Sequence, residues 1–62
     1  MTSICVFVSD NARAKNALDK IARLFPSYVS VNRNPYCKCL EVEILCQQED
    51  AWEIEQVLAP FV

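Results

Sequence analysis

Residues 37–46, CKCLEVEILC, alternate between two kinds of side chain. Successive residues of a β-strand point to opposite faces of the sheet, so each face receives every second side chain. One face of this segment would carry two cysteines, two glutamates and a leucine. The segment therefore predicts a strand that turns one face toward solvent and the other toward a core. The core face would carry Leu40, Val42, Ile44 and Cys46.

Two further segments predict strands. Residues 3–9, SICVFVS, are mostly β-branched or apolar, which is typical of a buried strand. Residues 27–32, SYVSVN, alternate Val29 and Val31 with more polar side chains, as a half-buried strand does. The chain has no glycine, so we expect any position that needs a positive φ in the turn at residues 32–35 to be an asparagine such as Asn32 or Asn34.

Residues 11–25 and 48–61 predict helices, because their apolar side chains recur at helical spacing. The polar segment 9–11 offers N-cap candidates for the first helix. Pro26 ends the first helix and Pro60 ends the second, since proline cannot continue a helix. The predicted apolar stripes are Ala14, Ala17, Leu18, Ile21, Leu24 and Phe25 in the first helix, and Ala51, Ile54, Val57, Leu58 and Phe61 in the second.

The element order is βαββα, which predicts a single α+β domain over residues 1–62. A strand–helix–strand crossover is right-handed, and a short turn makes the next strand antiparallel. We expect a three-stranded sheet with both helices packed on one face. The third strand fits either between the first two strands or outside the second. The topology resembles a ferredoxin-like βαββαβ unit that lacks its last strand, and this is a resemblance of topology alone.

Composition excludes several kinds of active site. The 62 residues include no histidine and no glycine. The chain therefore has no Ser-His-Asp or Cys-His arrangement, no P-loop and no dinucleotide-binding fingerprint. Carboxylate pairs such as Glu41 with Glu43 would need a water-excluded cleft for acid–base chemistry, and so small a domain has little room for one. We expect a protein that is not an enzyme and uses no cofactor.

Three of the four cysteines lie in residues 37–46. In a regular strand, Cys37 and Cys46 would be about 30 Å apart at about 3.3 Å per residue, so one metal ion cannot bind all three cysteines. Our first interpretation is that the cysteines serve as small hydrophobic residues. The alternatives are a thiol or soft-metal site made of Cys37 and Cys39, and a disulfide, either with Cys5 or between chains.

Charge is distributed unevenly along the chain. Residues 1–38 contain all six basic residues and two aspartates, a net charge of +4, whereas residues 39–62 contain six acidic residues and no basic one, a net charge of −6. Our first interpretation is two helices that present complementary faces to each other. The alternative is a surface for a charged partner.

A nucleic-acid-binding regulator is one such alternative, in which the basic face of the first helix contacts the phosphate backbone. The chain is acidic overall, and Glu41 and Glu43 would repel phosphate from the sheet, so we expect nucleic acid not to be the main partner. The basic residues in question are Arg13, Lys15, Lys20 and Arg23.

A protein partner fits the remaining features better. The outer sheet face lacks a covering helix, and the first strand is a bare edge that another chain could pair with. We expect Trp52 at the boundary of the core, with an interface anchor as its alternative role. The predicted partner-binding residues are Phe7, Tyr28, Glu41 and Glu43 on the sheet, and Glu49, Asp50, Trp52 and Glu53 on the second helix.

These features predict a small interaction module, inhibitor or regulator that binds another protein or a second copy of itself. In size and charge it is similar to inhibitors encoded by phages and other mobile elements. No apolar run approaches the roughly 20 residues of a membrane-spanning helix. The first ten residues lack the basic start of a signal peptide. We therefore expect a cytoplasmic protein with reduced cysteines and no membrane contact.

Overall fold

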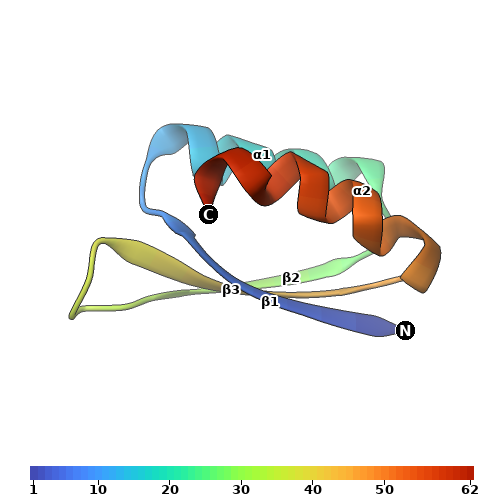
Figure 1. The fold of residues 1–62 in the computed structure, drawn as a ribbon, viewed down its shortest axis with the longest axis horizontal. Coiled ribbons are helices and arrows are strands. Elements are labelled where there is room, and N and C mark those ends of the chain that lie inside the picture. The colour runs from blue at the N-terminus through green and yellow to red at the C-terminus, as the bar shows by residue number, and fades with distance from the viewer.

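The computed structural model describes all 62 residues as an α+β fold with three antiparallel strands and two helices (Figure 1). The predicted element order is confirmed. No helix is both long enough and apolar enough to cross a membrane. The elements are β1 (Thr2–Ser9), α1 (Ala12–Leu24), β2 (Tyr28–Arg33), β3 (Cys39–Cys46), α2 (Gln48–Leu58) and a short 3-10 helix, η1 (Ala59–Phe61).

Strand β3 lies in the middle of the sheet, which has the order β1-β3-β2. It pairs antiparallel with β1 from Thr2 opposite Cys46 to Ser9 opposite Cys39. On its other side it pairs antiparallel with β2, from Tyr28 opposite Leu45 onward. The structure thus resolves the order that the sequence left open, because β3 inserts between the two strands that α1 connects.

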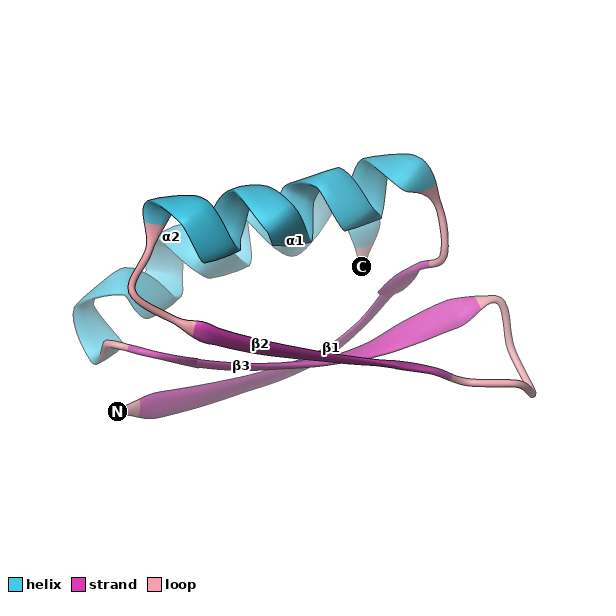
Figure 2. Cartoon of the chain, turned by 180° about the vertical axis from the view of Figure 1, so that it is seen from behind, coloured by secondary structure: helices cyan, strands magenta, loops and turns pink.

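Both helices cover the same face of the sheet (Figures 1 and 2). Helix α1 packs beside β2 and helix α2 beside β1, and the two helices also contact each other. The opposite face has no layer over it. The sheet therefore has an inner face under the helices and an outer face in contact with solvent.

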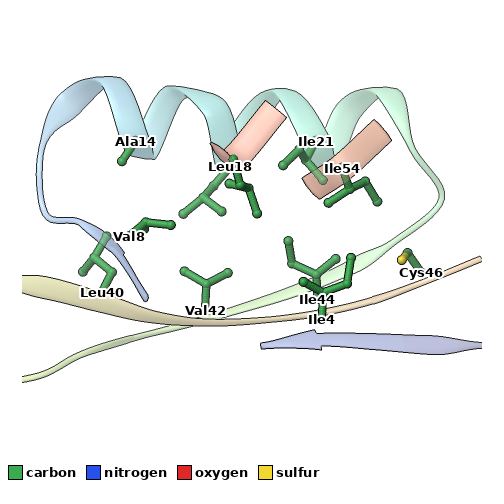
Figure 3. Packing of buried hydrophobic residues seen from close by; sticks show 11 residues of the cluster. Ile4, Val8, Ala14, Leu18, Ile21, Leu40, Val42, Ile44, Cys46 and Ile54 are labelled. Carbon is green, nitrogen blue, oxygen red and sulfur yellow. The ribbon is translucent and has the colours of Figure 1, made fainter. Parts of the chain in front are cut away.

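The core lies between the inner face and the helices (Figure 3). Strand β3 is its largest contributor because every inner side chain of the strand is buried, as the alternation of residues 37–46 predicted. Strand β2 contributes no fully buried residue, because a groove between it and α1 leaves its inner side chains partly uncovered. The cluster comprises Ile4, Val8, Ala14, Leu18, Ile21, Leu40, Val42, Ile44, Cys46, Ile54 and Leu58.

Helix α1 begins and ends where its flanking residues dictate. Asn11 is the N-cap, and its Oδ1 accepts a hydrogen bond from the Ala14 N–H at 2.9 Å. Phe25 leaves the helical conformation in front of Pro26, as residues before proline tend to do. Leu24 was predicted to face the core, but its side chain is 63% exposed. It shares a shallow groove with the polar side of α1 instead of reaching the sheet.

The connection between β2 and β3 is longer than predicted, because Cys37 and Lys38 belong to the loop and β3 starts at Cys39. Asn34 organises this loop. Its Oδ1 accepts from the Tyr36 N–H at 2.9 Å and its carbonyl accepts from the Cys37 N–H at 3.4 Å. No residue of the chain has a positive φ, so the expectation that Asn32 or Asn34 would adopt one is wrong and the loop closes without that conformation.

Replacing Asn11 with alanine removes the only side-chain cap of α1 and should destabilise the fold by about 1 kcal/mol. A loss of that size lowers the melting temperature of a 60–100-residue domain by about 4–8 °C. Thermal unfolding followed by far-UV circular dichroism measures the change. Asn16→Ala, at an exposed position inside α1, is the control and should melt close to the wild type. Equal melting temperatures for the two variants would contradict the capping role.

Candidate protein-interaction surfaces

The outer sheet face is a mixed surface made by side chains from all three strands. Residues opposite one another in neighbouring strands point to the same face, so the register defines rows across the sheet. The central rows place Glu43 between Cys5 and Ser30, and Glu41 between Phe7 and Asn32. The outer face predicted from the sequence is thus formed, with glutamates at its centre.

Aromatic side chains lie at the two margins of this outer face. Phe7 on β1 is 56% exposed and Tyr28 on β2 is 68% exposed. They lie in different rows on opposite edge strands, so the glutamates of β3 separate them. Cys5 donates a weak hydrogen bond to Glu43, with 3.7 Å between Sγ and Oε2. A phosphate backbone would meet carboxylates at the middle of this face.

Helix α2 presents a second surface on its solvent side. Glu49, Trp52, Glu53 and Gln56 are all exposed and follow the i, i+3, i+4, i+7 spacing of one helix face. Trp52 is 68% exposed, so the predicted position at the core boundary is wrong. Its indole points away from the core because Ile54 and Leu58 take the buried positions of this short helix.

The carboxylates of the second half of the chain take part in no ion pair. Asp10 contacts the Lys15 Nζ at 3.4 Å and the Arg33 Nε at 3.3 Å, and Asp19 pairs with Arg23. All of these residues belong to the first half. The two helices lie in contact, as predicted, but no ion pair joins their faces, and α1 pairs part of its positive charge with Asp10, which precedes the helix, and with Asp19 within it.

The eight predicted partner-binding residues form two separate surfaces. Phe7, Tyr28, Glu41 and Glu43 belong to the outer sheet face. The remaining four belong to α2, which covers the inner face on the other side of the sheet (Figure 1). Asp50 is half-buried, unlike its exposed neighbour Glu49. One flat partner cannot contact both surfaces at once, so each must be considered as its own site.

The predicted basic surface of α1 is smaller than its sequence implied. Two of its four cations are held by carboxylates, Lys15 by Asp10 and Arg23 by Asp19. Arg13 and Lys20 are free of ion pairs and flank a groove between α1 and α2. Nucleic-acid binding through this helix stays a prediction that the geometry does not strengthen.

The four cysteines occupy three different environments. Cys37 and Cys39 are joined as a disulfide in the β2–β3 loop region, Cys5 is a free exposed thiol, and Cys46 is a free buried one. The interpretation as a small hydrophobic residue is confirmed for Cys46 and is wrong for the Cys37–Cys39 pair. The expectation that all cysteines are reduced is also wrong, and the disulfide involves neither Cys5 nor a second chain. No three His, Cys, Asp or Glu side chains come together in a way that could hold a metal ion.

An apolar groove between α1 and β2 was not predicted. Val31 points to the inner face, yet it is 44% exposed because only the margin of α1 covers this edge strand. Only the sheet order could reveal this groove, since a central β2 would have buried Val31. The lining residues are Lys15, Leu18, Asp19, Ala22, Val29, Val31, Arg33 and Leu40.

No protein-family model, no curated protein and no solved structure matches this chain. The two surfaces and the cysteines are therefore the features of the chain that bear on its function.

Burial predicts a clear order of reactivity for the two free thiols. Cys46 is 0% exposed, whereas Cys5 is exposed on the outer face. A thiol reagent should label Cys5 rapidly in the native protein and label Cys46 only when the chain unfolds. Mass spectrometry of labelled peptides, with Cys5→Ser as the control, measures both rates. Rapid native labelling of Cys46 would contradict the packing of the core.

Proposed function

We propose that this protein is a non-enzymatic interaction module that binds the basic surface of another protein through the exposed face of α2. The observation that supports the proposal is an exposed Trp52 flanked on the same helix face by Glu49 and Glu53, which have no ion-pair partner within the chain. A regulator or inhibitor in the cytoplasm is the role that suits such a module.

Trp52 and the carboxylates would contribute in different ways. Tryptophan is enriched among the few residues that supply most of the binding energy in protein interfaces. Exposed carboxylates mainly accelerate association with a positively charged partner and select against acidic ones, and salt weakens both effects. The acidic first turn is also favourable for the helix itself, because Glu49 and Asp50 lie near the positive end of its dipole.

The outer sheet face is the secondary part of this proposal. Phe7 and Tyr28 provide exposed aromatic area at its margins, and Glu41 and Glu43 provide negative charge between them. Interfaces of transient complexes have this mixture of aromatic and polar area. A partner that engaged this face would leave α2 free, so the protein could connect two partners.

We also propose that the fold is a ferredoxin-like unit without its last strand. The support is the position of β3 between β1 and β2, two strands that run in the same direction and are connected by α1. This is the arrangement of a split βαβ unit. Such a fold hosts many unrelated functions, so it adds nothing to the choice of partner.

The charge-reversed variant Glu49→Lys, Asp50→Lys, Glu53→Lys should lose partner binding while it stays folded. The reason is that the triple substitution replaces the negative face of α2 with a positive one. Wild-type and variant baits are used in parallel to capture basic proteins from a native extract, and the captured protein is purified. Titration followed by Trp52 fluorescence should show at least about a tenfold weaker affinity for the variant, or about 1.4 kcal/mol.

Arg13→Glu, Lys20→Glu is the matched control, because it changes two exposed charges on α1 and leaves α2 intact. It should bind as the wild type does or more tightly. Equal affinities for the wild type and the α2 variant, at low salt and with both folded, would refute the proposal. Retention of nucleic acid by the wild type and its loss in the α1 control would favour the nucleic-acid alternative.

A second candidate function is thiol–disulfide exchange at Cys37 and Cys39. The observation that favours it is the disulfide between these two residues, which closes a ring across one residue where the exposed β2–β3 loop meets the start of β3. Such a short loop contributes little to stability through chain entropy, so the fold does not depend on the bond. In a cytoplasm, disulfides are usually transient and serve redox chemistry or sensing.

The exchange transfers two electrons and two protons. A dithiol of a partner protein would be oxidised to a disulfide, and the Cys37–Cys39 bond would break to give two thiols. The intermediate is a mixed disulfide between one partner sulfur and one of the two loop sulfurs.

This second candidate predicts a reversible change in mass by two hydrogen atoms across glutathione buffers of defined ratio. The circular dichroism spectrum should stay unchanged, because neither cysteine belongs to the buried core. A Cys37→Ser, Cys39→Ser variant should show no such transition. A pair that stays oxidised, or stays reduced, across the whole range of buffers would exclude exchange under cellular conditions.

A further inference from the structure

Strand β1 has an open edge. It pairs with β3 on one side only, and no other strand lies beyond it (Figure 1). Natural proteins protect such edges with charged residues, prolines, bulges or very short strands. Strand β1 has eight residues, continuous pairing, no charge and no proline. An unprotected edge of this kind is suited to pairing with another strand.

The pairing with β3 determines which backbone groups face the open side. Antiparallel strands alternate between residues that exchange hydrogen bonds and residues that do not. Asp10 follows β1 and donates its N–H to the Lys38 carbonyl at 3.5 Å. Asp10 lies opposite Lys38 in the continued register, so every second residue before it also bonds to β3. The residues between them, Ser3, Cys5, Phe7 and Ser9, direct their N–H and C=O groups away from β3.

A second hydrogen bond agrees with this assignment. Asn34 follows β2 and donates its N–H to the Cys39 carbonyl at 3.4 Å. In the continued register Asn34 lies opposite Cys39, so the odd-numbered residues of β3 bond to β2. The even-numbered residues of β3 are then the ones that bond to β1. Each residue of β3 therefore hydrogen-bonds to only one of its two neighbouring strands. The backbone N–H and C=O groups of the odd-numbered residues of β1 have no partner in the sheet.

One end of the open edge is already occupied. The Ser9 hydroxyl donates to the Phe61 carbonyl at 3.4 Å, and the Ser9 carbonyl accepts from the Asn11 N–H at 3.0 Å. The residues that keep both their N–H and their C=O group available are Ser3, Cys5 and Phe7. This set is symmetric about Cys5, so the edge is complementary to an antiparallel copy of itself.

We propose that β1 pairs with β1 of a second copy of this chain, antiparallel and centred on Cys5. Ser3 of each copy then bonds to Phe7 of the other, and Cys5 faces the partner's Cys5. The contact uses the same surface on both copies, so it closes at a dimer and does not extend into a filament. The result is a continuous six-stranded sheet with all four helices on one face.

Side chains and charges permit this pairing. On the inner face, Ile4 lies opposite Val6 of the second copy, and pairs of β-branched residues stabilise antiparallel sheets. Val6 is only half-buried in the single chain, and the pairing would bury more of its side chain. On the outer face, the two Glu43 side chains are three strand spacings apart, about 14 Å at about 4.8 Å each. Salt screens charges beyond about 8 Å at physiological ionic strength, so their repulsion is weak.

The other edge of the sheet is a poorer partner. Strand β2 has six residues, and Arg33 places a charge at its end. Pro26 precedes it and Pro35 follows it closely, and proline limits the length over which a new strand can pair. The dimer therefore forms through β1. The inference does not depend on the acidic surface of α2, because that surface lies outside the paired edge.

Sedimentation equilibrium and chemical cross-linking test the dimer. The chain is prepared with Cys37→Ser and Cys39→Ser, so that Cys5 is the only exposed thiol and Cys46 is buried. The Cα atoms of a hydrogen-bonded antiparallel pair are about 5.5 Å apart. A short bifunctional thiol reagent should therefore join the two copies at Cys5 in high yield. The same protein with Cys5→Ser should stay dimeric and give no cross-link.

Two lysine variants distinguish an effect on the β1 edge from a general effect of added charge on the outer face. Cys5 and Ser30 flank Glu43 in the same row, so Cys5→Lys and Ser30→Lys add the same charge beside the same carboxylate. Only Cys5→Lys places two like charges opposite each other at the two-fold axis. It should weaken the dimer at least about tenfold, whereas Ser30→Lys should leave it unchanged. Circular dichroism confirms that both variants are folded.

A monomeric wild type at all concentrations would overturn the inference, as would equal weakening by the two lysine variants. A dimer without a Cys5 cross-link would overturn the proposed register. If Cys5→Lys unfolds, the cross-link in the otherwise native chain still decides the question. None of these results affects the proposed function, which the α2 charge reversal tests on its own.

Discussion

The alternation of side chains in β3 is the constraint on which the rest of the structure depends. This strand supplies hydrogen bonds to both neighbours, and four of its side chains, from Leu40 to Cys46, are buried under the helices. Its other face carries Glu41 and Glu43, which cannot be buried without partners. A shift of one residue in its register would exchange the two faces and place both carboxylates in the core.

Local sequence signals were sufficient to predict the elements of this fold. Helical spacing, the N-cap candidates at residues 9–11 and the proline stops are short-range features, and the structure follows them to within a few residues. The order of the strands was not predictable, because nothing local distinguishes a central β3 from an outer one. The exposure of Leu24 and Trp52 was missed for a related reason. Both residues have apolar character, but the short helices have only a few positions that reach the sheet.

The candidate surfaces were predictable in part. The outer face followed from the alternation of β3, and the separation of the acidic residues into two surfaces follows from the packing of both helices on the inner face, which was also predicted. The sequence alone did not predict that the two halves of the chain form no ion pairs with each other. That prediction would have required knowing that Asp10 pairs with two cations of its own half. A domain of this size has a small core, so exposed Trp52, Phe7 and Tyr28 represent apolar area that the chain itself does not use. The proposed binding surfaces would cover that area.

Hydrogen exchange of individual amides, followed by NMR at several protein concentrations, tests the arrangement of the sheet most directly. A central β3 with an open β1 edge predicts slow exchange along all of β3 and alternating exchange along β1 in dilute solution. The amides of Ile4, Val6 and Val8 should exchange slowly, and those of Ser3, Cys5 and Phe7 rapidly. As the concentration rises, Ser3, Cys5 and Phe7 should become protected. Uniform exchange along β1, or rapid exchange within β3, would contradict a central β3 with an open β1 edge.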